Sequence, residues 1–80
     1  MTIHSASIVR DAMRNGGESE GLKFVTIYSY TIRESNKPMY ALFVDANHDD
    51  MDVSPYIQSY TCLMANGILT VEGKNFLNEE

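Results

Sequence analysis

Residues 22–33 read LKFVTIYSYTIR, and this stretch decides the fold class. It is filled with β-branched and aromatic residues, which is typical of a β-strand. Side chains alternate across a strand, so one face, which we predict to be the core, takes Leu22, Phe24, Tyr28, Tyr30 and Ile32. The opposite face then takes Lys23, Val25, Ile27, Ser29, Thr31 and Arg33.

A hairpin and two helices extend this strand. The turn-forming residues 34–38 lead into a second strand over 39–46, which is apolar on both faces and is expected to pair antiparallel with the first. Residues 5–15 carry an apolar stripe at helical spacing and end at glycines. A second helix is predicted over 55–66, because Pro55 suits a first helical turn, and its core-facing stripe would hold Tyr56, Ile57, Tyr60, Leu63 and Met64.

The C-terminal segment leaves two alternatives open. Residues 68–72 form either a third strand or a short link to a terminal helix capped by Thr70. We favour the strand, because Gly73 would weaken such a helix. The prediction is a single α+β domain over residues 1–80, of order αββαβ, with an antiparallel hairpin packed against two helices.

The acidity of the chain is local. The net charge is −5, and the segment 45–52 supplies four carboxylates without any Lys or Arg, from Asp45, Asp49, Asp50 and Asp52. The remainder carries seven acids against six bases and shows no basic stripe, so direct binding of nucleic acid is not expected.

A single cysteine, Cys62, excludes an internal disulfide and is compatible with the cytoplasm. No apolar run approaches the roughly 18 residues of a membrane span. We therefore expect a soluble, unprocessed cytoplasmic protein without membrane contact.

The acidic segment resembles a calcium loop only in part. Asp45, Asn47 and Asp49 match positions 1, 3 and 5 of an EF-hand. The glycine that the turn requires is replaced by Asp50, and the final glutamate by Tyr56. We predict no metal site and interpret the segment as a solvated loop.

No catalytic constellation or cofactor motif is apparent. A triad of Cys62, His48 and Asp49 or Asp50 can be written from residue types, but no spacing brings these residues together. Arg10 and Arg14 share a helical face and could grip a phosphate or a carboxylate, although such pairs are more often solvated. We expect no enzyme activity and no cofactor.

Two readings of the sheet faces remain. Phe24, Tyr28 and Tyr30 would make a base-stacking platform only if exposed and ringed by Lys and Arg, so we interpret them as core. If both predicted helices pack on the sheet face that holds these three aromatic residues, the opposite face exposes an apolar patch of Val25, Ile27, Met39, Ala41 and Phe43. The alternative is one helix on each face. An exposed patch would hold a second copy of the chain or another protein.

The sequence therefore predicts a small, acidic, non-catalytic binding or regulatory protein that acts through protein contacts. A first alternative is an inhibitor of the kind encoded by phages and mobile elements, whose carboxylates imitate nucleic-acid phosphates in a basic groove of a host factor. A second alternative is a small ligand-binding domain or enzyme. The residues predicted to bind a partner are Asp45, Asp49, Asp50, Asp52, Val25, Ile27, Met39, Phe43, Arg10 and Arg14.

Overall fold

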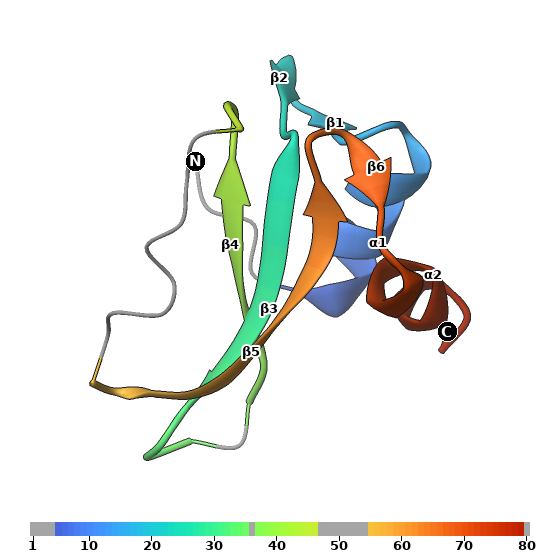
Figure 1. The fold of residues 1–80 in the computed structure, drawn as a ribbon. Helices are drawn as coiled ribbons and strands as arrows, with labels where there is room; N and C mark the ends of the chain where they lie inside the picture. Colours follow the sequence, from blue (N-terminus) through green and yellow to red (C-terminus); the bar gives the residue numbers. More distant parts are fainter. Residues whose placement is uncertain (1–4, 36, 47–54, 80) are drawn as a thin grey trace.

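The computed structural model describes residues 5–35, 37–46 and 55–79, which form a mixed α+β domain (Figure 1). In chain order, the described elements are α1 (Ala6–Arg14), β1 (Glu18–Ser19), β2 (Leu22–Lys23), β3 (Thr26–Ile32), β4 (Met39–Phe43), β5 (Ile57–Ala65), β6 (Ile68–Leu69) and α2 (Val71–Leu77). Neither described helix is long and apolar enough to cross a membrane.

Within the described residues, a four-stranded antiparallel sheet of order β4-β3-β5-β6 forms the centre of the domain, and β1 and β2 make a separate small ribbon. In the hairpin, Ile27 lies opposite Leu42, and Tyr28 lies opposite Ala41. Both helices lie on one side of the sheet (Figure 1). The predicted fold class, an antiparallel hairpin packed against two helices, is confirmed.

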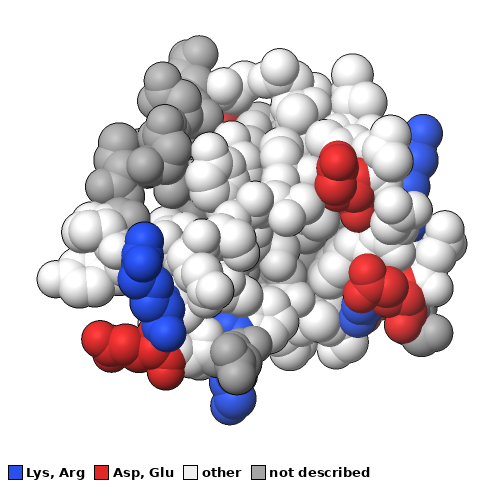
Figure 2. Space-filling view, turned by 60° about the horizontal axis from the view of Figure 1, so that its bottom comes forward, with Lys and Arg blue, Asp and Glu red and all other residues white. Residues whose placement is uncertain are grey.

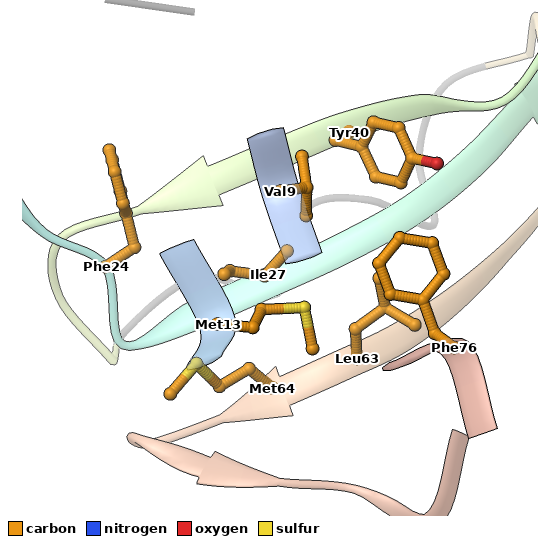
Figure 3. Close-up of a cluster of buried hydrophobic side chains, with 8 residues drawn as sticks. All are labelled: Val9, Met13, Phe24, Ile27, Tyr40, Leu63, Met64 and Phe76. Atoms are coloured by element: carbon orange, nitrogen blue, oxygen red, sulfur yellow. The ribbon is translucent and has the colours of Figure 1, made fainter. Parts of the chain in front are cut away.

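The core lies between the two helices and the sheet (Figure 3). Its buried apolar residues come from α1, α2, three strands and the segment before β3, and they are Val9, Met13, Phe24, Ile27, Tyr40, Leu63, Met64 and Phe76. Val9 and Ile27 are fully buried. Helix α1 matches the prediction for residues 5–15, because Ser5 caps it by accepting a hydrogen bond from the Ile8 amide.

The predicted helix over 55–66 is wrong, since Ile57–Ala65 forms β5, the strand next to β3. The cause is a β-bulge. Ile27 pairs with Met64 and Tyr28 pairs with Cys62, so Leu63 is an extra residue, and both Leu63 and Met64 are buried in the core. Two adjacent core residues break the alternation of a strand and imitate the spacing of a helix.

The strand favoured for residues 68–72 is only partly right, and the terminal helix given as the alternative forms with Gly73 inside it. A strand forms only over Ile68–Leu69, and α2 follows it with Thr70 as its N-cap. The Thr70 hydroxyl accepts from the Gly73 amide at 2.9 Å and donates to the Cys62 carbonyl at 2.6 Å. These two bonds fasten the start of α2 to β5.

The alternation of side chains between the two faces shifts by one residue within the strand predicted over residues 22–33. Phe24 and Val25 lie between β2 and β3, so the alternation that begins at Leu22 does not continue into β3. Phe24 is buried as predicted, but Ile27 faces the helices in place of Tyr28. The predicted core face is therefore wrong for β3, because a one-residue change of phase reverses every following side chain.

Candidate functional site: an aromatic sheet face

The sheet face that points away from the helices is lined by aromatic and apolar side chains. Among the residues that strand alternation and the observed register place on it are Tyr28, Tyr30, Met39, Ala41, Phe43, Tyr60 and Cys62, and we call this set the aromatic face. Ile27, the neighbour of Tyr28 in β3, packs with both helices in the core, which fixes the side that the aromatic face occupies.

Tyr28 is the centre of an aromatic row that crosses three strands. Its ring meets Phe43 of β4 at 6.2 Å between centroids and Tyr60 of β5 at 5.8 Å, both edge to face at 77°. Edge-to-face packing is the favoured arrangement of aromatic pairs and holds each ring in one orientation. The row is therefore a rigid surface built on strands rather than on loops.

Exposure within the aromatic face is uneven. Tyr60 is 45% exposed and Met39 38% exposed, while Tyr28 and Phe43 are half-buried by their neighbours. Tyr56, just before β5, is 69% exposed. A surface of this kind presents accessible aromatic groups at its rim and fixed rings at its centre.

A hollow of about 350 Å³ lies at the end of β3 and is lined by Ile32, Arg33, Glu34 and Tyr56. Ile32 follows Tyr30 on the same face by alternation, so the hollow borders the aromatic face. The Arg33 side chain donates its Nε–H to the Pro55 carbonyl at 3.2 Å, and the Arg33 amide donates to the Tyr56 carbonyl at 2.9 Å. These bonds fix the backbone that forms the wall of the hollow.

In the view of Figure 2, charged side chains of both signs lie toward the sides of the molecule, with a broad uncharged area between them. Along the chain, Arg33 and Lys37 lie beside the hairpin turn, and Asp45 follows the opposite end of β4. The described residues thus give the aromatic face mixed charge at its borders rather than a basic rim.

The predicted apolar patch is only partly assembled. Met39 and Phe43 lie on the aromatic face, but Ile27 is buried in the core and Val25 lies between two strands. The prediction paired odd-numbered residues of the two strands, whereas the observed register pairs odd with even. An apolar face does exist, with Tyr28 and Tyr30 where Val25 and Ile27 were expected.

The acidic segment can be located only at its start. Asp45 is exposed just after β4, while Asp49, Asp50 and Asp52 lie outside the described residues, as does His48. The metal and triad hypotheses for this segment are therefore untested. In the described part of the chain, no group of three or more His, Cys, Asp or Glu side chains could hold a metal ion.

Cys62 stands on the aromatic face beside Tyr28 and is half-buried. Its thiol donates to the Met64 carbonyl at 3.5 Å. Burial raises the pKa of this thiol above its usual 9.0, which the Met64 hydrogen bond partly opposes and the Glu72 charge reinforces. A raised pKa keeps the group a neutral thiol at pH 7, and the thiol is the unreactive form.

The side chains of Arg10 and Arg14 make hydrogen bonds within the domain. Arg10 donates its Nε–H to the Phe76 carbonyl at 2.9 Å, and its guanidinium lies 4.3 Å from the Phe76 ring centroid. Arg14 donates to the Leu77 carbonyl at 3.2 Å and lies 3.6 Å from Asp11. Both arginines thus bind carbonyls at the C-terminal end of α2, where the helix dipole favours positive charge. Their predicted contact with a partner is not tested by these bonds.

A groove of about 450 Å³ lies on the helix side of the sheet. Its lining mixes polar side chains such as Arg10, Ser29 and Thr61 with apolar ones such as Leu63 and Phe76, so the two helices do not cover that face of the sheet completely. Burial raises the pKa of the Tyr40 hydroxyl above 10.0; the Arg10 charge lowers it in part, and the Glu79 charge raises it.

Comparison of the chain with models of protein families, with curated proteins and with solved structures gave no match. The site is therefore defined by its geometry. Sequence reasoning missed Tyr60 and misplaced Tyr28 and Tyr30, all assigned to the core.

Proposed function

We propose that this protein is a non-catalytic protein-binding module of the cytoplasm whose recognition surface is the aromatic face. The observation that carries the proposal is the row of Tyr28, Phe43 and Tyr60 on the sheet face opposite both helices. An aromatic surface exposed to water is costly unless a partner covers it, and such patches mark interaction sites.

The composition of the aromatic face suits a protein partner. Tyrosine and methionine are enriched at protein interfaces, and tyrosine is frequent among the residues that supply most of the binding energy. The rings are held by their neighbours before a partner arrives, so little side-chain entropy is lost on binding. The hollow beside Ile32 and Tyr56 offers a place for one apolar side chain of that partner.

A single-stranded nucleic acid is the less suitable occupant. The exposed rings meet one requirement of a base-stacking platform, but such platforms also need a basic groove for the phosphates. Here Arg33 and Lys37 stand at one end of the hairpin, and Asp45 stands at the other. The phosphate-imitating inhibitor remains a prediction that no described residue favours.

Site-specific crosslinking in the native host tests the proposal. A photoreactive phenylalanine analogue replaces Tyr60 on the aromatic face in one variant and Val71, which is 69% exposed on α2, in a matched control. We expect one protein to be captured from position 60 and not from position 71. Excess unmodified protein should abolish the capture.

The captured protein is then purified and titrated with defined variants. Tyr60→Ser and Tyr30→Ser should each weaken binding by about tenfold or more, since truncating an interface anchor costs about 1–2 kcal/mol or above. Val71→Ser should bind as the wild type does. Equal affinity for all variants would exclude the aromatic face as the recognition surface, and preferential capture of RNA or DNA from position 60 would replace the protein partner with a nucleic acid.

A further inference from the structure

The two edges of the sheet are protected to different degrees. At one edge, β6 is only two residues long and leads directly into α2. At the other edge, β4 is five residues long, has the sequence MYALF, and pairs with β3 on one side. Within the described residues, no strand pairs with its outer side.

Edge strands of monomeric proteins normally carry a device that prevents further pairing, such as a lysine, a proline or a bulge within the strand. Lys37 and Pro38 stand just before β4, but Met39–Phe43 itself contains no charged residue and no proline, and its pairing with β3 runs without a register shift. Over these five residues, and as far as the described part of the chain extends, the edge is apolar, regular and uncovered, and such an edge is a template for another strand.

The backbone groups of β4 that point away from β3 are identified by one observed hydrogen bond. The Phe43 carbonyl accepts from the Val25 amide at 2.9 Å, so the backbone of Phe43 faces β3. Backbone groups alternate along a strand, and therefore the N–H and C=O groups of Tyr40 and Leu42 point away from β3. Any strand added to this edge must bind at Tyr40 and Leu42.

We propose that a second copy of this chain adds its own β4 antiparallel to this edge, about a twofold axis that passes between the two Ala41 residues. In this register, Tyr40 of one copy exchanges both backbone hydrogen bonds with Leu42 of the other. Met39 lies opposite Phe43 of the second copy on the aromatic face. The smallest side chain of the strand, Ala41, occupies the axis, where the two backbones approach closely.

Charge complementarity selects this register. Lys37 and Asp45 lie four positions from Ala41, in bends just outside the two ends of β4, so this register brings each lysine to the same end of the paired strands as the aspartate of the other copy. Moving the axis to Tyr40 would set Lys37 against Phe43, and moving it to Leu42 would set Asp45 against Met39. Opposite charges at both ends contribute more to the choice of register than to affinity.

The pairing has a definite consequence for the aromatic face. A twofold axis perpendicular to a continuous sheet keeps equivalent faces on the same side. The helices of both copies therefore lie on one side, and the two aromatic faces join on the other. The inference uses the edge of the sheet rather than its face, so it holds or fails independently of the proposed function.

Disulfide trapping tests both the edge and the register. In a Cys62→Ser background, Ala41→Cys places two thiols at a pair that makes no backbone hydrogen bonds, where the Cα atoms are about 4.5 Å apart and within reach of a disulfide. Met39→Cys is the matched control on the same strand and face. Its two copies would be roughly 13 Å apart, too far to bridge.

In a glutathione redox buffer, we expect a covalent dimer from Ala41→Cys and a monomer from Met39→Cys, with the wild-type protein sedimenting at twice the mass of one chain. Lys37→Glu should weaken the dimer by about fivefold, and adding Asp45→Lys should restore it. A strictly monomeric wild type at high micromolar concentration, equal crosslinking at both positions, or crosslinking at Met39 alone would overturn the proposal.

Discussion

Gly73 allows α2 to approach β5 more closely than any other residue would. A Cβ atom at this position would lie 2.9 Å from the Leu63 carbonyl carbon and closer still to its oxygen. The obstacle is backbone in the central sheet, which cannot rotate away as a side chain does. Gly73→Ala must therefore displace α2, whose Phe76 packs in the core and whose Thr70 cap is bonded to β5.

The expected loss of stability follows from three contributions. Overpacking costs about 1–3 kcal/mol, and strain on the Thr70 cap adds about 1 kcal/mol. The higher helix propensity of alanine returns about 1 kcal/mol. The net loss is about 2 kcal/mol, which for a domain of this size lowers the Tm by roughly 8–16 °C.

Urea and thermal unfolding followed by far-UV circular dichroism measure this loss. Asn75→Ala is the matched control, because Asn75 is exposed in the same helix and alanine should stabilise it by up to about 0.5 kcal/mol. An unchanged or higher Tm for Gly73→Ala would show that helix propensity dominates at this position. That result would refute the close approach of α2 to Leu63 and the explanation of Gly73.

Two further predictions concern the groups that surround α2. Arg10→Met should destabilise the domain by about 2 kcal/mol in urea unfolding, because the Phe76 carbonyl loses a charged donor and the ring loses its cation. Arg14→Met, at an exposed side chain, should cost below about 1 kcal/mol, and equal losses would contradict the role given to Arg10. Burial raises the folded pKa of Tyr40 above 10.0, so its contribution to stability is complete below pH 10 and is lost as the pH rises through the folded pKa. The free energy of unfolding of Tyr40→Phe should fall less above pH 10 than that of the wild type, and parallel profiles from pH 8 to 11 would contradict this.

The sequence predicts elements well where the pattern is local. Helix α1 and the hairpin follow from caps, turns and alternation. The errors arise from two irregularities that single residues introduce. Val25 changes the phase between β2 and β3, and Leu63 is inserted as a bulge in β5. Neither residue type marks an irregularity, so only tertiary pairing decides where the phase changes.

The candidate site depends on the same two irregularities. Their combined effect sends Ile27, Leu63 and Met64 to the helix side and leaves Tyr28, Tyr30 and Tyr60 on the other. That one sheet face stays uncovered can be predicted from helix length alone. Helices of nine and seven residues extend only about 13 and 10 Å and can cover one face of the sheet at most. An open apolar face is therefore predictable from helix length, whereas its chemical character is not. Restoring strict alternation by deleting Leu63 would exchange the two faces of the N-terminal half of β5, and the loss of folding expected from this deletion would show that the bulge is required to keep the tyrosines outside.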